Sequence, residues 1–185
     1  MNFFMRVLFI LLVSSLGILF NNCKTKDEKN DITEVAKSYG LIYTAFVTTK
    51  QVQNRFFGKA TDLLGQIKYN NDVVIDTKEL ELLLDSAKKA NETQISLINL
   101  AEEPDQSIRY KEKALRYIMM LKELYNNQFP QLITIFNSNE ENGFERSQKL
   151  ILAKMSEMSK AMYECRDAGV ELVEKYDIKT PDIVE

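Results

Sequence analysis

The side chains available for chemistry are limited by one absence, because none of the 185 residues is histidine. Ser-His-Asp and Cys-His catalysis, the common catalytic zinc sets, histidine-ligated haem and di-iron bundle sites all depend on imidazole. No Gly-x-x-x-x-Gly-Lys phosphate loop or Gly-x-Gly-x-x-Gly turn occurs either. The carboxylate pairs Glu102 with Glu103 and Glu140 with Glu141 fall at expected helix ends or loops, where water solvates them. We therefore expect no enzymatic activity, no cofactor and no metal.

One set of polar side chains is expected to share a single level of the fold. Folding the chain back on itself near residues 72, 104 and 140 aligns Gln53, Asn91, Gln94, Tyr117 and Cys165, with Glu164 beside the cysteine. One interpretation is a small-ligand site inside a helical bundle, where such sites are usually built. The other is a hydrogen-bonded layer that fixes the register of the helices, and we favour it.

Sulfur-containing residues gather near the same level. Met119 and Met120 are expected at the height of Met158 and Met162, beside Cys165. Soft sulfur ligands could hold copper(I) or haem. We favour core packing instead, because methionine fills gaps at helical spacing and no second ligand type is present. Cys165 has no histidine to activate it, so we expect a small buried hydrophobic residue there.

The charged residues do not point to one particular function. Without the first 22 residues, the chain holds 23 basic and 27 acidic residues, a net charge of −4 that disfavours nucleic-acid binding. Arg109, Lys113 and Arg116 form a local basic stripe that an acidic polymer or protein could use. Such stripes are commonly the solvated face of an amphipathic helix, and we favour that interpretation.

Four amphipathic helices must position these residues. Apolar residues recur in steps of three and four over residues 32–67, which predicts the first helix. At the start of the second, Asp76 is expected to cap the helix, Glu79 to reach back, and Ile75 to pack on Leu80. Pro104 ends this helix, because proline disfavours helical geometry in the preceding residue.

The third and fourth helices are predicted over residues 105–136 and 144–176, with turn-forming residues 137–143 between them. Pro130 removes one backbone hydrogen bond and predicts a kink or break near Gln128. No stretch alternates long enough to form a sheet, so the predicted class is all-α, an up-down-up-down four-helix bundle. A broken third helix would give five helices.

The first residues read as an export signal. Arg6 precedes an apolar run from Val7 to Phe20, whose 14 residues fall short of the about 20 needed to span a bilayer. We therefore expect cleavage. An uncleaved anchor is the alternative, favoured by the excess of lysine after the run over the single basic residue before it.

The end of this run, Phe20-Asn21-Asn22-Cys23, resembles the lipid-modified cysteine of bacterial lipoproteins. The usual pattern has Ala or Ser, then Gly or Ala, where Asn21 and Asn22 stand, and the relaxed patterns of spirochaetes and Bacteroidota tolerate such residues. The resemblance implies a palmitate-type lipid on Cys23 and a place in the bacterial envelope, at the outer membrane or cell surface. Ordinary signal cleavage without lipidation is the other reading. A lipidated Cys23 would leave Cys165 without a disulfide partner.

These observations divide the chain into a signal peptide (1–22), the lipidated cysteine and a flexible tether (23–30), a helical bundle (31–178) and a C-terminal tail (179–185). By exclusion, we expect binding of another protein through the surface. The resemblance to small surface lipoproteins implies host-protein binding as one form of this function. The alternative is a carrier of a small apolar ligand in a closed cavity lined by Met119, Met158, Met162 and phenylalanines.

Overall fold

The computed structural model describes residues 26–69, 75–138 and 142–179. Within these ranges all regular structure is helical and no strand occurs. None of the described helices is long and apolar enough to cross a membrane. The predicted signal peptide and Cys23 lie outside the described residues.

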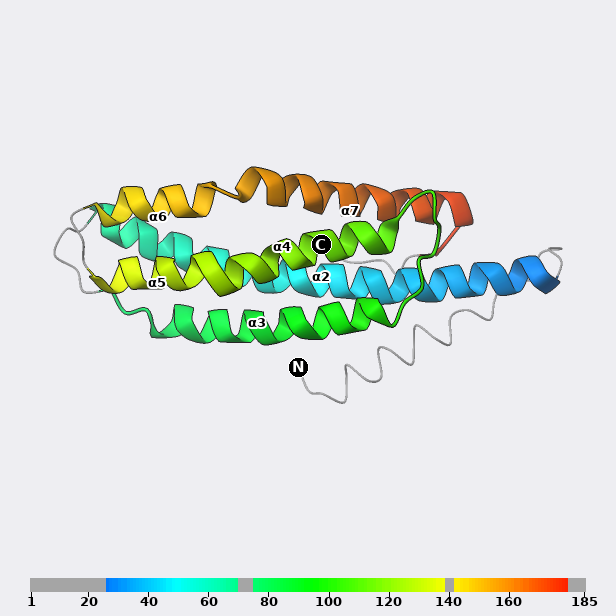
Figure 1. The fold of residues 1–185 in the computed structure, drawn as a ribbon, viewed down its shortest axis with the longest axis horizontal. Coiled ribbons are helices and arrows are strands. Elements are labelled where there is room, and N and C mark those ends of the chain that lie inside the picture. The colour runs from blue at the N-terminus through cyan, green and yellow to red at the C-terminus, as the bar shows by residue number, and fades with distance from the viewer. Residues whose placement is uncertain (1–25, 70–74, 139–141, 180–185) are drawn as a thin grey trace.

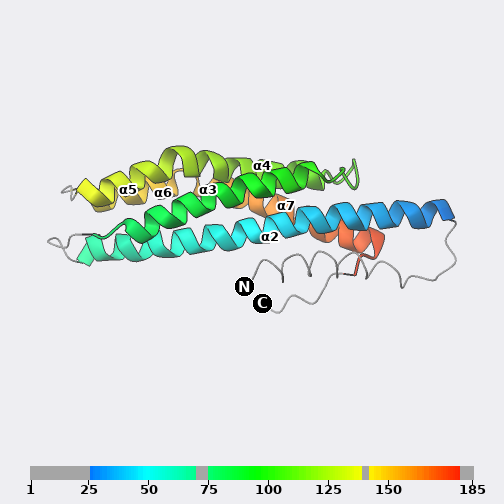
Figure 2. The same ribbon diagram turned by 90° about the horizontal axis from the view of Figure 1, so that it is seen from below.

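The helices form four rods that run side by side in alternating directions (Figure 1, Figure 2). The first two rods are single helices, and each of the last two is built from consecutive segments. In order these are α2 (Lys26–Tyr69), α3 (Lys78–Asn99), α4 (Tyr110–Glu123) with the π-helix η2 (Leu124–Gln128) and α5 (Phe129–Ser138), and α6 (Gly143–Leu152) with α7 (Met155–Tyr176). The prediction of an all-helical bundle is confirmed.

The core follows the predicted apolar stripes. On α2 the side chains of Ile42, Phe56 and Ala60 are completely buried. Phe56 stacks on Phe129 of α5 with ring centroids 4.5 Å apart, and it meets Tyr125 edge-on at 6.1 Å. Burying an aromatic side chain of this kind contributes about 2–3 kcal/mol. This aromatic cluster joins the first rod to the third.

The start of α3 lies slightly later than predicted. The helix begins at Lys78, and the carboxylate of Asp76 accepts a hydrogen bond from the Lys78 backbone N–H at 3.1 Å. The Thr77 hydroxyl donates to Glu81 at 2.7 Å. Glu79 does not reach back; it forms an ion pair with Lys59 of α2. Asp76 therefore bonds to the start of the helix as expected, whereas Glu79 does not take the part predicted for it.

The third rod stays continuous past its proline. The Phe129 backbone N–H donates to the carbonyl of Leu124, five residues earlier, in place of the usual four. This π-helical turn lies directly before Pro130, which has no N–H to donate. The irregularity predicted near Gln128 is present as a π-helix, without a break into two separate rods.

The fourth rod differs from prediction, because the expected single helix is divided. α6 ends at Leu152, Ala153 and Lys154 form a turn, and α7 begins at Met155. Lys154 has a φ of −117°, far from helical values. The turn changes the phase of the stripe, so that Met158 is buried while Met155 is exposed.

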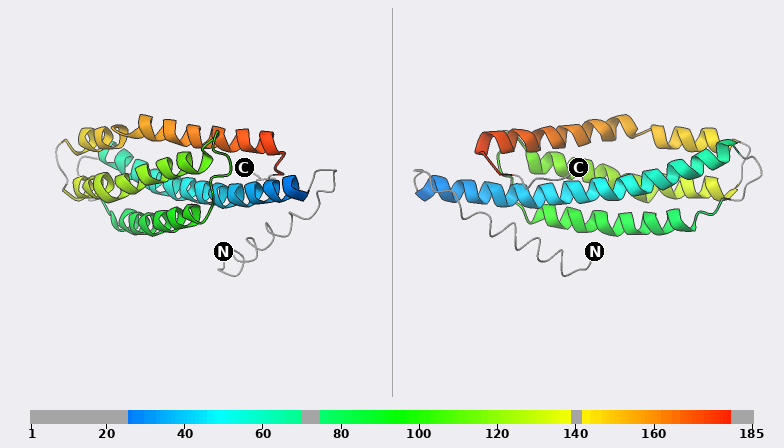
Figure 3. Two further views of the ribbon diagram at one scale, coloured as in Figure 1. Left: turned by 45° about the vertical axis from the view of Figure 1, so that its right-hand side comes forward. Right: turned by 180° about the vertical axis from the view of Figure 1, so that it is seen from behind.

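The first rod extends beyond the predicted start of the bundle. α2 begins at Lys26, so residues 26–30 of the predicted tether belong to this helix. Figure 3 shows this end of α2 projecting past the neighbouring rods. At the other end of the chain, α7 ends at Tyr176, and Asp177 adopts a left-handed conformation with a φ of 50°.

Candidate functional site

The five residues of the predicted polar layer are all buried. Their exposed fractions lie between 0 and 8% for Gln53, Asn91, Gln94, Tyr117 and Cys165. They come from all four rods, namely α2, α3, α4 and α7. The sequence thus identified polar residues that enter the core, and their contacts determine what they can do.

Gln53 is the centre of this layer. The Tyr117 hydroxyl donates to Gln53 Oε1, and Gln53 Nε2 donates to the sulfur of Met158 at 3.4 Å. Burial raises the pKa of Tyr117, so its hydroxyl is a neutral donor at ordinary pH. One glutamine of α2 therefore links α4 and α7.

Asn91 forms a separate contact within the layer. Its Nδ2 donates to the backbone carbonyl of Ile118 at 3.1 Å, which fixes α3 against α4. The Asn91 Oδ1 atom is buried and has no hydrogen-bond partner. Gln94, one turn further along α3, is 8% exposed. These groups are neutral donors and acceptors, and most of their bonds connect helices.

Cys165 is a buried free thiol. Burial raises its pKa to about 12, although the charge of Lys113 opposes this shift. A thiol with this pKa is almost wholly protonated at neutral pH and is a poor nucleophile. Its surroundings match the expected small hydrophobic residue.

The methionines do not form the cluster that the sequence suggested. Met158 is 4% exposed and Met120 and Met162 are half-buried, whereas Met119 is 49% exposed. Met119 follows the buried Ile118 directly, and one residue rotates a helix by about 100°. Met119 therefore neither packs in the core, as we favoured, nor lines a cavity there, and both expectations were wrong for this residue.

The predicted basic stripe is partly neutralised. Arg109 lies just before α4 and donates to Glu112 at 2.6 Å, and Arg116 donates to Glu164 of α7 at 2.9 Å. Lys113, between them in sequence, is half-buried. Glu164, expected beside the polar layer, instead forms this surface ion pair. The stripe does not present three unpaired cations.

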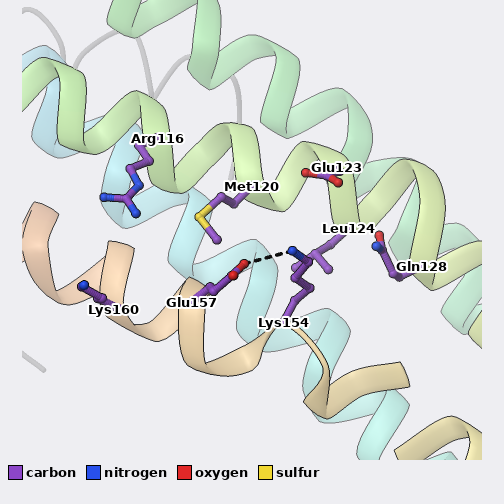
Figure 4. Close-up of a pocket in the computed structure, with 8 residues that line it drawn as sticks. All are labelled: Arg116, Met120, Glu123, Leu124, Gln128, Lys154, Glu157 and Lys160. Atoms are coloured by element: carbon purple, nitrogen blue, oxygen red, sulfur yellow. Dashed lines mark hydrogen bonds and ion pairs between the residues drawn. The ribbon is translucent and has the colours of Figure 1, made fainter. Parts of the chain in front are cut away.

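A surface cleft of about 460 Å³ lies between the third and fourth rods (Figure 4). Met120 and Leu124 of the third rod supply its apolar lining. On the side formed by the fourth rod, Lys154 Nζ donates to Glu157 at 3.0 Å. The remaining lining residues are Arg116, Glu123, Gln128 and Lys160. The cleft forms where the π-helix η2 faces the turn between α6 and α7.

Sequence reasoning missed this cleft. The π-helix was signalled by Pro130, but the turn at residues 153–154 contains neither glycine nor proline. Because a cleft between rods depends on both irregularities, periodicity within one helix could not reveal it. A second cleft, of about 530 Å³, lies between α5 and α6 and is lined by residues that include Gln131, Ile135 and Leu150.

The outer surface carries apolar side chains that the core does not use. Leu82, in the second turn of α3, and Leu100, directly after its end, are 70 and 76% exposed. On α7, Met155, Tyr163 and Val170 are 36, 48 and 50% exposed. In the described residues, no group of three or more Cys, Asp or Glu side chains is placed to hold a metal ion.

Comparison of the chain with models of protein families, with curated proteins and with solved structures found no match. The geometry of the described residues is therefore the basis for a functional proposal.

Proposed function

We propose that this chain is a lipid-anchored helical protein of the bacterial envelope that acts by binding another protein through its outer helix faces. Its proposed place is the outer membrane or cell surface, and binding of a host protein is one form of this function. Support for the anchor comes from the 14-residue apolar run and from the lipobox-like sequence that ends at Cys23.

The observation that carries the binding proposal is the contrast between core and surface. Inside, Gln53 and Asn91 are hydrogen-bonded to neighbouring rods, and Cys165 is held as a protonated thiol. Outside, Tyr163 and Val170 lie exposed one above the other on α7. Exposed apolar groups on one face are typical of interaction surfaces when they form a continuous patch. Function at the surface therefore fits better than chemistry in the core.

Carriage of a small apolar ligand is the second candidate. The cleft beside Met120 and Leu124 has a volume of about 460 Å³, within the usual range of ligand sites. Five of its lining residues are charged, namely Arg116, Glu123, Lys154, Glu157 and Lys160, so it suits an apolar ligand poorly. Native mass spectrometry of protein purified from its own cells would reveal a ligand of fixed mass if this candidate were right.

The anchor is tested by growing cells with radiolabelled palmitate and isolating the protein. We expect the wild-type chain to carry label and Cys23→Ala to carry none. Cys165→Ala is the matched control, because this thiol is buried and its removal should leave the label unchanged. Equal label on wild type and Cys23→Ala, or none on wild type, would contradict the anchor.

Placement is tested separately by treating intact cells with a protease. Loss of the full-length chain from intact cells supports the cell surface. Protection until the outer membrane is permeabilised would place the domain on the inner side. A periplasmic chain could not bind host proteins, so that outcome would contradict the host-binding form of the proposal.

A further inference from the structure

The apolar residues on the outside of α7 form a regular stripe. Tyr163 and Val170 are seven residues apart, which keeps them on one side of the helix, whereas Met155 lies about 80° further round. Tyr163 and Val170 each lie two residues before a buried core residue, Cys165 and Leu172. Because two residues turn a helix by about 200°, the stripe faces away from the core.

Charged residues flank this stripe in an ordered way. Lys160, Asp167 and Glu174 are spaced by seven, so they form a second row beside the apolar one. All three are exposed, and the side chains of Lys160 and Asp167 are 72 and 65% accessible to solvent. The row is positive towards the start of α7 and negative towards its end.

We propose that α7 pairs with α7 of a second copy of this chain in antiparallel orientation. A two-fold axis near Tyr163 would then bring Lys160 of each copy opposite Asp167 of the other. A two-fold interface of this kind uses the same patch twice, which requires a patch that is complementary to itself.

The alternative parallel arrangement lacks this complementarity. It would place Asp167 beside Asp167 and Lys160 beside Lys160 at any symmetric contact of this row. Like charges at close range are unfavourable, whereas opposite charges favour the pairing and set its orientation. The charge order on α7 therefore selects the antiparallel pair.

The ring of Tyr163 is already held in place for such a contact. The guanidinium of Arg166 lies 4.8 Å from the ring centroid of Tyr163. The same arginine donates to Asp167 Oδ1 at 3.0 and 2.9 Å, which leaves Oδ2 for a lysine from outside. Pre-ordered side chains lose less entropy on binding.

This inference deepens the proposed function, on which it rests, by naming a second copy as the partner. α2 begins at the end of the bundle where α7 ends (Figure 1). An antiparallel pair therefore directs the two predicted anchors to opposite sides. The 22 residues of α7 span about 33 Å, which limits the contact to the small end of interface sizes. We expect a dissociation constant of about 1 μM or weaker.

Sedimentation velocity of the full-length chain, with detergent micelles in excess, tests the pair over a range of protein concentrations. Wild type should convert from monomer to dimer as concentration rises. Lys160→Glu and Asp167→Lys should each weaken association about tenfold, because each turns two attractive contacts into repulsive ones. A 1:1 mixture of the two variants should regain wild-type affinity, since opposite charges then meet at both contacts.

Leu82→Glu is the control, because Leu82 is 70% exposed on α3 and lies off this surface. It should dimerise as wild type does, and circular dichroism should show that all variants keep their helix content. A wild type that stays monomeric throughout, or a mixture that associates no better than either variant alone, would overturn the proposal. Palmitate labelling is independent of these results, so failure of the pair and failure of the anchor are distinguishable.

Discussion

Gly169 of α7 packs against the ring of Tyr110 of α4. A Cβ atom added to the glycine would lie 3.2 Å from Cε2 of Tyr110 and 3.3 Å from its hydroxyl oxygen. Tyr110 is 1% exposed, and its ring stacks on that of Tyr39 with centroids 5.6 Å apart. The close approach of α4 and α7 at this point therefore depends on the absence of a side chain at residue 169.

Gly169→Ala is therefore expected to destabilise the fold by about 1–3 kcal/mol, the usual result of overpacking a core. Gly58→Ala on α2 is the matched control, because nothing lies within 4 Å of the added Cβ there. This control should gain stability, by up to about 1 kcal/mol, from improved helix propensity. Urea unfolding followed by circular dichroism measures both. Equal effects of the two substitutions would show that Tyr110 yields.

Tyr117→Phe removes the hydroxyl that donates to Gln53 Oε1. The buried glutamine oxygen loses its partner, so we expect a loss of about 1–3 kcal/mol in the free energy of unfolding. Tyr125→Phe is the control, because the Tyr125 hydroxyl is buried without a partner. Its removal should leave stability unchanged or raise it. A larger loss for Tyr125→Phe than for Tyr117→Phe would contradict this assignment of the two hydroxyls.

Asp105 connects the loop after α3 to the end of α7. Its carboxylate accepts hydrogen bonds from Lys175, from Ser107 at 2.6 Å and from Tyr176 at 2.8 Å, and these bonds lower its pKa, that from Lys175 most strongly. Asp105→Asn should cost about 1.5 kcal/mol at neutral pH, at the low end for bonds to a charged group because Lys175 is half exposed.

The same carboxylate gives a pH dependence with a defined sign. A lowered pKa in the folded state means that the unfolded state binds protons more readily, so the stabilisation is complete above the unfolded value of about 3.9 and is lost as pH falls below it. The stability difference between wild type and Asp105→Asn should therefore shrink below about pH 4. A difference that stayed constant between pH 7 and pH 3 would contradict the role of this carboxylate.

Cys165 should resist modification in the folded protein. Burial and a pKa of about 12 leave almost no reactive thiolate at neutral pH. We expect reaction with a disulfide reagent to be at least about 100-fold slower in native protein than in protein unfolded by guanidinium. Cys165→Ala identifies any signal that comes from Cys23. Rapid labelling of Cys165 in native protein would mean that α7 opens easily.

The sequence predicted helix positions well because periodicity reports which residues share one face of one helix. Ile42, Phe56 and Leu84 are buried as their spacing indicated, and Pro130 marked the π-helix. Periodicity could not show the turn at residues 153–154, where no glycine or proline interrupts the pattern. That turn shifts the face of α7, so Met155, an apolar residue within the predicted fourth helix, is exposed.

The sequence predicted which residues lie in the polar layer better than it predicted the hydrogen bonds between them. Folding the chain at its loops placed Gln53 and Tyr117 at one level, because antiparallel rods align residues equally distant from a turn. Which of the buried polar atoms find partners depends on rotamers and on shifts of one residue in register. Asn91 Oδ1 and the Tyr125 hydroxyl are left without partners for that reason, and no spacing rule signals them.

The length of the uninterrupted helix α2 determines how far the bundle extends along its long axis. Its 44 residues rise by about 66 Å at 1.5 Å per residue. If the chain leaves a lipid bilayer at Cys23, three residues before Lys26, the ends of α5 and α6 stand roughly that far from the bilayer surface. Residues at that end of the bundle would then meet a target about 66 Å from the bilayer, and residues near Lys26 would not.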